Sequence, residues 1–439
     1  MGLPLTMMDA AIVSQTMPGR PMTTHHVLEL GAPLSRGALE RAVEHLSASY
    51  PGLRTRPKEH FFGWERIVDA PDAARARAQL TFLTAPGLVE QSSWVETPFK
   101  LNDEWPFRVR YGPTPRGTFS LCFTLHHSVT DGHGALVLFD ALLAAALAAE
   151  AGRPMPEAVA APAPVAPWRT ILKRGPAFLF ALVLKILSHV PLMWQHRAVL
   201  LDAPLAPVEG FGVKVLPLSP RAWMELKTRA TALGCTRNDL LCAAALKSVA
   251  AVHRARAERD LPLRMLGVAD LRPFFGAPGP VSNWMGTLEV DVTPAELDAP
   301  GLELLLHRQL VAGRDPLPAL ATPALLGVLG TILPVPMVRA FFRWIDAPGT
   351  SNPFSILVSH IRPPGGLCWP EALQPRGLWC ASTLPRKPGL GLTITTVGDH
   401  VSIAACWPRP LVREETIDAL LAQLRVELGD DARAEALSA

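Results

Sequence analysis

The chain has 439 residues, of which 49% are apolar and 18% are charged, and its net charge is +3. This composition excludes a disordered or fibrous protein, and the small net charge without a long basic run argues against a nucleic-acid-binding protein. The length suffices for two globular units, each with a core of its own.

The first half alternates between strand-like and helix-like segments. Residues 25–31 predict a strand, and residues 34–51 predict an amphipathic helix. Residues 118–127, "TFSLCFTLHH", alternate in side-chain character along the segment, so a regular strand would place His126 and His127 on opposite faces. Residues 134–150 predict a buried helix.

An alanine- and proline-rich stretch over residues 151–168 predicts an extended linker. We therefore divide the chain into an N-terminal unit at residues 1–150, a linker with an apolar helix at residues 151–205, and a C-terminal unit at residues 206–439.

The second half repeats the mixture of strands and helices. Strands are predicted over residues 211–219, 263–273, 286–292 and 354–361, and a hairpin over residues 389–407. Helices are predicted after Ser219, as an N-cap, and over residues 235–260. Alternation of this kind in both halves favours an α/β or α+β protein with mixed sheets.

Two apolar stretches have a composition that is compatible with contact with lipid. Residues 176–194 are flanked by Lys173, Arg174 and Arg197, as an interfacial membrane helix would be. Residues 316–338 carry no charge, but five prolines argue against a continuous membrane helix. The alternative is that both stretches are core or channel-lining helices, and the mean hydropathy of +0.21 leaves peripheral membrane contact open.

The six cysteines form no CxxC pair and no zinc-finger spacing. They predict buried, reduced thiols in a cytoplasmic protein. They are Cys122, Cys235, Cys242, Cys368, Cys380 and Cys406.

Residues 125–135, "LHHSVTDGHGA", hold the densest group of chemically active side chains. His126, His127, Asp131 and His133 are competent metal ligands, but neighbouring strand residues face apart and no helix-spaced histidine or glutamate completes a site. The stretch can also be a polar turn in which Asp131 caps the following helix.

A third interpretation is nucleophilic or general-base catalysis. Residues 349–353 come closest to a serine-hydrolase elbow, but proline stands where the last glycine is needed. A neutral histidine can instead take the proton of an alcohol or amine that attacks an activated acyl carbon, and this route needs no enzyme nucleophile.

His126–Gly132 resembles the HHxxxDG motif of the coenzyme-A-dependent acyltransferase superfamily. This superfamily includes chloramphenicol acetyltransferase, peptide-synthetase condensation domains, polyketide-associated acyltransferases and wax-ester synthases. Other stretches that resemble it lie at residues 6–30, 234–246, 269–273, 282–290, 357–366 and 389–407.

The resemblance implies two chloramphenicol-acetyltransferase-like subdomains that form a pseudo-dimer, with an active-site tunnel between them. It implies that His127 is the general base, that Asp131 orients the loop through an ion pair with Arg272, and that Gly132 leaves room for substrate. His126 would be structural.

The sequence identifies less clearly which residues would stabilise the oxyanion or contact the substrate. Asn283, Ser359 and Thr395 are the candidates that the resemblance suggests. His360 stands where relatives usually carry asparagine.

These features predict an acyltransferase that moves an acyl group, most simply a fatty one, from a thioester to an alcohol without a covalent acyl-enzyme. The donor would be acyl-CoA or an acyl carrier protein as cosubstrate, with no bound cofactor and no metal. One alternative is a stand-alone condensation enzyme that uses a carrier-bound acyl or peptidyl donor, in trans, with an amine or alcohol. More distant alternatives are a non-catalytic scaffold and a metal-dependent hydrolase.

Overall fold

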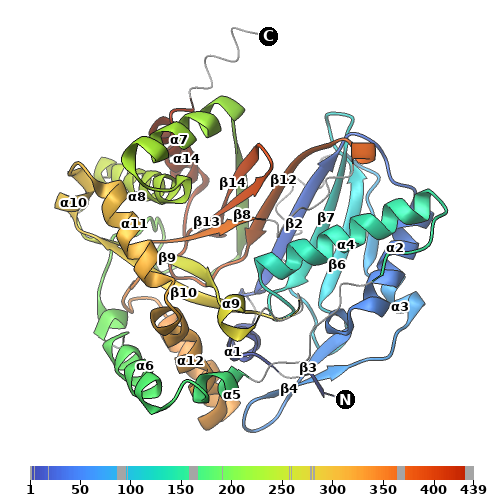
Figure 1. The fold of residues 1–439 in the computed structure, drawn as a ribbon, viewed down its shortest axis with the longest axis horizontal. Coiled ribbons are helices and arrows are strands. Elements are labelled where there is room, and N and C mark those ends of the chain that lie inside the picture. Colours follow the sequence, from blue (N-terminus) through green and yellow to red (C-terminus); the bar gives the residue numbers. More distant parts are fainter. Residues whose placement is uncertain are drawn as a thin grey trace.

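A computed structural model of the chain contains two α/β halves that lie side by side (Figure 1). It describes residues 2–3, 5–17, 19–86, 95, 97–157, 167–189, 191–256, 258, 260–276, 279, 282–362 and 371–430. The predicted mixed α/β class is confirmed. The large sheet of each half contains both parallel and antiparallel strand pairs, and helices pack on both sheets.

The N-terminal half is built on a five-stranded sheet whose order is β12-β2-β7-β6-β5. These strands are Pro375–Ser382 (β12), Thr23–Leu30 (β2), Phe119–His126 (β7), Phe107–Pro113 (β6) and Leu80–Phe82 (β5). Beside it lies a small sheet of Gly2–Leu3 (β1), Trp64–Val68 (β4) and Thr55–Glu59 (β3).

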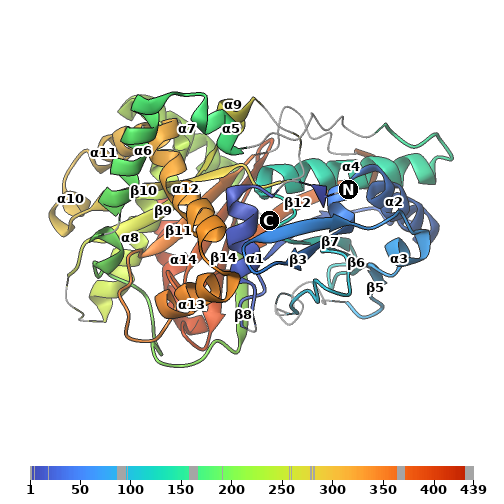
Figure 2. The ribbon, with the colours of Figure 1, turned by 90° about the horizontal axis from the view of Figure 1, so that it is seen from below.

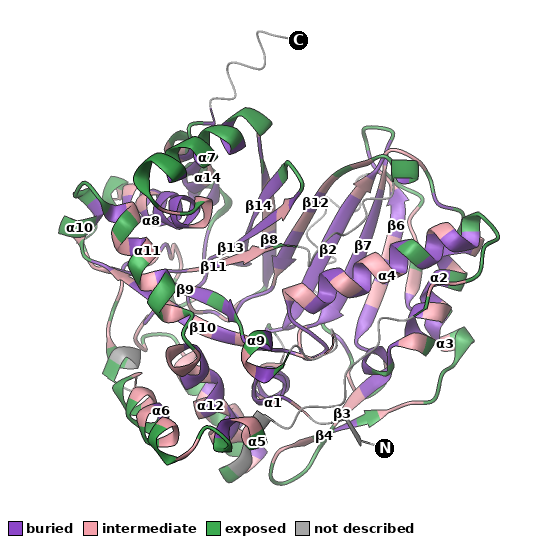
Figure 3. Ribbon diagram, in the orientation of Figure 1, coloured by how far each residue is buried: buried purple, intermediate pink, exposed green. Residues whose placement is uncertain are grey.

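Helices cover one face of this sheet. Arg36–Ser49 (α2) and Gly132–Glu150 (α4) pack on it and on each other, and the short helix Ala73–Arg77 (α3) lies against α2. In the described part of the chain, α4 alone is long and apolar enough to cross a membrane. Most of it is buried against the sheet, as expected for a core helix (Figure 3).

The C-terminal half is built on a six-stranded sheet of order β10-β9-β11-β13-β14-β8. Its strands are Met285–Val292 (β10), Leu263–Asp270 (β9), Ile356–Ile361 (β11), Gly391–Val397 (β13), His400–Arg409 (β14) and Gly210–Leu218 (β8). The parallel strand β11 lies between β9 and β13, so the predicted hairpin β13–β14 joins a mixed sheet.

The helices of this half follow the sequence signals closely. The predicted cap Ser219 and Pro220 begin Pro220–Leu233 (α7), and Thr236 caps Arg237–Ala255 (α8). The others are Pro167–Leu172 (α5), Pro176–His189 (α6), Arg272–Phe275 (α9), Pro294–Asp298 (α10), Leu302–Gly313 (α11), Pro316–Ile332 (α12), Val335–Ile345 (α13) and Glu414–Leu428 (α14).

The two apolar stretches become α6 and α12. Helix α12 contains Pro323 and packs against β10, α6 and Met7–Gln15 (α1), so residues 316–332 form a core helix. The predicted linker falls mostly on residues 158–166, which lie outside the described residues. Five free cysteines are described, four of them buried; Cys368 lies outside the described residues.

One strand ties the two halves together. Strand β12 belongs by sequence to the C-terminal unit, yet it pairs along its length with β2 of the N-terminal sheet. It also packs against β13 and β14. The N-terminal sheet therefore includes a strand that follows most of the C-terminal unit in the sequence.

We expect the fragment of residues 1–157 to be insoluble when it is expressed alone. Without β12, β2 becomes the edge strand of an apolar sheet with one side of its backbone unpaired, and such edges aggregate. Soluble yield and far-UV circular dichroism of the fragment, with the full chain prepared in the same way as the control, test this. A soluble fragment with a cooperative thermal transition would contradict it.

Candidate active site at the junction of the halves

The end of β7 separates the two adjacent histidines as the alternation predicts. His126 is fully buried, and its ring contacts the hydroxyls of Ser128 (Nδ1 to Oγ 2.7 Å) and Thr16 (Nε2 to Oγ1 2.9 Å). Burial, followed by the nearby charge of His127, lowers the pKa of His126 to about 3. His126 is therefore a neutral residue held by protein contacts on both ring nitrogens.

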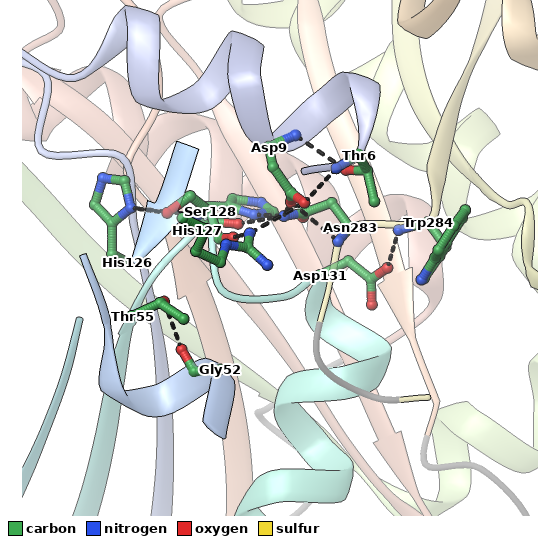
Figure 4. A network of polar contacts seen from close by, with 11 residues as sticks. Thr6, Asp9, Gly52, Thr55, His126, His127, Ser128, Asp131, Asn283 and Trp284 are labelled. Carbon is green, nitrogen blue, oxygen red and sulfur yellow. Dashed lines mark hydrogen bonds and ion pairs between the residues drawn. The ribbon is translucent and has the colours of Figure 1, made fainter. Parts of the chain in front are cut away.

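His127 is half-buried, and its ring is fixed by Asn283 from the other half (Figure 4). The amide nitrogen of Asn283 lies 2.7 Å from Oδ1 of Asp9 and 2.6 Å from the backbone carbonyl oxygen of His127. Both are acceptors, so Nδ2 donates to them and Oδ1 faces the imidazole. Nδ1 of His127 therefore donates to this oxygen over 3.1 Å, and Nε2 is left with a free lone pair.

Asp9, from α1, supports this arrangement. Its Oδ1 also accepts from the backbone amide of Asn283 at 3.2 Å, and its Oδ2 forms a buried ion pair with Arg66 of β4 at 3.0 Å. The same arginine nitrogen donates to the carbonyl of Ser128 at 2.5 Å. Sequence reasoning missed Asp9 and Arg66 as site residues, although Asp9 lies in a stretch that carries the family resemblance.

Asp131 connects the loop after β7 to the C-terminal half. Its Oδ1 accepts from Arg272 at 2.8 Å, so the predicted ion pair is present, and from the backbone amide of Gly134 at 3.0 Å. Its Oδ2 accepts from the backbone amide of Trp284 at 2.8 Å. Asp131 is thus both the N-cap of α4 and a link between the halves.

The contacts of Gly132 and Asn283 bear on the roles predicted for them. A Cβ at Gly132 would lie 2.6 Å from Cδ1 of Ile361, so glycine allows a close approach of Ile361 here, and the predicted role in leaving room for substrate stays a prediction. The amide hydrogens of Asn283 are used by Asp9 and His127, so Asn283 orients the histidine and does not supply an oxyanion donor. An amide side chain has only two hydrogens to donate.

Ser359 and Thr395 lie on neighbouring strands of the C-terminal sheet. In the parallel register of β11 and β13, Thr395 pairs with Ile361, two residues beyond Ser359. The three side chains therefore share the sheet face that contacts the loop after β7. Their roles in oxyanion or substrate binding stay predictions.

Strand β2 contributes two residues that sequence reasoning did not single out. Nδ1 of His26 lies 3.0 Å from the thiol of Cys380, and burial, followed by the charge of His127, lowers the pKa of His26 to about 3. Among the described residues, Nε2 of His26 and the hydroxyl of Thr24 are buried and have no hydrogen-bond partner. Such atoms are costly to bury, and they are free to contact a bound substrate.

A cationic cavity of about 300 Å³ lies between α8, α11 and the strands β9 and β11. Gly267, Leu288 and Leu310 form part of its apolar lining, and Arg314 and Arg362 supply positive charge. Within the described ranges neither arginine forms an ion pair with an acid. Val358, His360 and Arg362 line this cavity and alternate along β11 with Ser359 and Ile361, so the cavity lies on the opposite face of the sheet from the side chain that contacts Gly132.

His360 also lines this cavity, and its ring is fully engaged. Nδ1 contacts Oδ1 of Asn238 at 3.0 Å, and Nε2 contacts the hydroxyl of Thr396 at 2.9 Å. Burial, with Arg362 and other arginines nearby, lowers its pKa to about 3. The histidine that replaces the usual asparagine is thus a neutral, structural member of the cavity wall.

A larger cavity, of about 510 Å³, lies elsewhere. It is lined by Val27, Ser120 and Trp379 of the N-terminal sheet and by His400 of β14, and it contains none of the predicted site residues. No group of three histidine, cysteine or acidic side chains placed to hold a metal occurs among the described residues.

The comparisons with known proteins identify the fold. No family model and no curated protein matches the sequence. The first condensation domain of the CDA synthetase is similar in structure, with 17% identity, a TM-score of 0.67 and coverage of 98% of this chain and 97% of that one. The trichothecene 15-O-acetyltransferase of Fusarium sporotrichioides has 11% identity, a TM-score of 0.71 and coverage of 97% and 94%.

Polyketide synthase associated protein 5 of Mycobacterium tuberculosis is also similar, with 16% identity, a TM-score of 0.63 and coverage of 97% of this chain and 99% of that one. The chain therefore has, over nearly its whole length, the fold shared by the condensation domain, the acetyltransferase and polyketide synthase associated protein 5. The fold predicted from the HHxxxDG resemblance is confirmed.

We expect Asp131→Asn to lower the free energy of unfolding by about 3 kcal/mol, because it leaves the buried guanidinium of Arg272 without its main counter-charge. Urea unfolding followed by tryptophan fluorescence measures this. Asp270→Asn is the matched control: Asp270 contacts the same arginine, but its side chain is 45% exposed, so the loss should stay below about 1 kcal/mol. Equal losses in the two variants would contradict the bracing role of Asp131.

Proposed function

We propose that this chain, which has the condensation-domain and acyltransferase fold, transfers an acyl group from a thioester to a hydroxyl group. The observation that carries the proposal is the fixed ring of His127. Its Nδ1–H is held by Asn283, so Nε2 is the nitrogen left to accept a proton. His127 is also half-exposed, whereas His126 is buried on both ring nitrogens.

In the proposed reaction, Nε2 of His127 takes the proton of the acceptor hydroxyl while its oxygen attacks the thioester carbonyl carbon. The tetrahedral intermediate then collapses, the carbon–sulfur bond breaks, and the thiolate leaves with the proton from the imidazolium. The ester and the free thiol are the products. No bond to the enzyme forms, so no nucleophilic serine or cysteine is required.

Asn283 and Asp9 would assist this step by positioning. While the imidazolium exists, its Nδ1–H continues to donate to Oδ1 of Asn283. The carboxylate of Asp9 accepts from the amide of Asn283 and so keeps that oxygen pointed at the ring. Base assistance of this kind contributes about 10²–10⁴-fold to a rate.

The cationic cavity supports a donor that carries phosphate. Arg314 and Arg362 lie beside Thr236 and Asn238 at the N-terminus of α8, where backbone amides and the helix dipole also favour an anion. Coenzyme A and the phosphopantetheine arm of a carrier protein both combine phosphate with a thiol. We favour acyl-CoA, and a carrier-bound acyl or peptidyl donor with an amine or alcohol acceptor is the second candidate.

The direct experiment is a panel of acyl-CoA and acyl-carrier donors of different chain length, each offered to alcohols and amines, with product mass as the readout. An ester formed from acyl-CoA supports the first candidate. Product formed only from the carrier-bound donor supports the second. No transfer from any thioester would favour a non-catalytic scaffold of the same fold.

We expect His127→Ala to lower kcat for the transfer found in this panel by about 10²–10⁴-fold, since the variant has no base beside the acceptor. Circular dichroism should show an unchanged fold, because the side chain of His127 is half-exposed. His133→Ala, in the first turn of α4 and also half-buried, is the matched control and should keep most of the activity. Near-normal transfer by His127→Ala would disprove the base assignment.

We expect Arg314→Gln and Arg362→Gln each to raise KM for acyl-CoA by about tenfold, equivalent to the loss of about 1.4 kcal/mol of phosphate binding. KM for the matching N-acetylcysteamine thioester, which has the same acyl group but no phosphate, should not change. Equal effects on both donors would show that the two arginines do not recognise phosphate.

A further inference from the structure

Helix α6 is apolar on the side that faces away from the protein as well as on the side that packs. Its inner side is formed by Leu182, which is buried, with Phe178, Leu179 and Ile186 against the core of the C-terminal half. Its outer side has large apolar residues at i, i+3, i+4 and i+7. They are Phe180, Val183, Leu184 and Leu187, with 67%, 52%, 51% and 58% of each side chain's surface exposed.

Such an outer stripe is unusual on a protein surface. Single exposed apolar side chains are normal, but helices that are apolar on all sides are found in protein cores and in membranes. Helix α5, directly before α6, adds Leu172, which is 59% exposed. We call these five residues the α6 stripe.

The charged side chains that α5 and α6 themselves carry are all of one sign, and Glu289 of β10 lies 3.7 Å from His189 at the end of α6. Residues 167–189 contain four cationic side chains and no acidic one. The four are Arg169, Lys173, Arg174 and Lys185. The guanidinium of Arg174 lies over the ring of Phe274, with its carbon 4.5 Å from the ring centroid, so this cation is held against α9 just before α6 begins.

A second group of exposed apolar side chains extends this side of the molecule. Phe61 and Phe62, at the tip between β3 and β4, are 67% and 56% exposed, and Ile332 and Met337 are 66% and 55% exposed. The backbone amide of Val335 donates to the carbonyl of Phe61 at 3.0 Å, so the tip adjoins the junction of α12 and α13.

The figures place these elements on one side. Helices α5, α6 and α12 and the β3–β4 tip lie along the lower edge of Figure 1, which faces the viewer in Figure 2. Helix α6 packs on α12, and α12 packs on α13. In Figure 3, exposed residues are prominent along α6 and at the β3–β4 tip.

We infer that the α6 stripe and its cations bind the surface of an anionic phospholipid bilayer, with α6 lying in the plane of the interface. The apolar stripe would enter the boundary between headgroups and acyl chains, and the cations would contact anionic headgroups. Charge argues against a second copy of this chain as the occupant, because a symmetric contact would bring two sets of cations together and α5 and α6 carry no acid.

The test is flotation of the full-length protein in a density gradient with vesicles of phosphatidylcholine alone or with added phosphatidylglycerol. The wild-type protein should float with the anionic vesicles and bind more weakly at high salt. The double variant Phe180→Ser and Leu184→Ser should show a vesicle partition coefficient lower by about tenfold or more. Met224→Ser with Val426→Ser is the matched control, since these residues are 53% and 66% exposed on α7 and α14, and it should bind as the wild type does.

Three results would overturn the inference: no flotation of the wild-type protein with anionic vesicles, binding independent of phosphatidylglycerol and salt, or equal binding by the stripe variant and the control. Light scattering after size-exclusion chromatography tests the alternative that a second copy of this chain binds the α6 stripe. A wild-type dimer that the stripe variant converts to a monomer, without vesicle binding, would assign the surface to self-association. Because no substrate is used, the outcome is independent of the proposed transferase activity.

Discussion

Two consecutive backbone amides, those of Asn283 and Trp284, hold the candidate site together. The first donates to the carboxylate of Asp9 and the second to that of Asp131, at 3.2 and 2.8 Å. Asp9 belongs to α1 and Asp131 to the loop after β7, so one short segment of the C-terminal half fixes two separate elements of the N-terminal part of the chain. The position of His127 depends on both contacts, because its ring and its carbonyl are held by the side chain of Asn283.

Each carboxylate is neutralised by its own buried arginine. Arg66 pairs with Asp9, and Arg272 pairs with Asp131. A buried ion pair is a poor source of net stability, because the cost of removing two charges from water offsets most of their attraction. It gives strong directional restraint instead, since any displacement leaves a buried charge unpaired. This restraint is what a site formed between two halves of one chain requires, and strand β12 adds a backbone connection between the same halves.

The sequence predicted those parts of the site that depend on local pattern. Side-chain alternation along β7 placed His126 and His127 on opposite faces, and a capping residue before a helix is visible at Asp131. The partners that complete the site could not be read in this way. Asp9 and Asn283 are separated by 274 residues, and nothing in one sequence reports that α1 meets the segment after α9.

The same reason explains the other differences. Gly132 signals close approach, but only the fold shows that Ile361 is the group that approaches. Arg314 and Arg362 are unremarkable in the sequence, at the end of one helix and the end of a strand, and they become a cationic cavity only when β11 and α11 pack together. Residues 375–382 were assigned to the C-terminal unit with the rest of residues 206–439 and no strand was predicted there, yet they form β12, which pairs with β2.

The histidines around His127 also bear on where a proton can reside. His26 and His126 both have a pKa of about 3, because burial disfavours their charged forms and a charge on His127 would repel a second one. Both rings therefore stay neutral over the physiological pH range and cannot compete for the proton of an acceptor. Their ring nitrogens still act as hydrogen-bonding groups, and within the part of the chain that the structure describes Nε2 of His26 has no partner. Of these three histidines, His127 is therefore the one to which we assign the proposed base role, and both buried rings stay neutral.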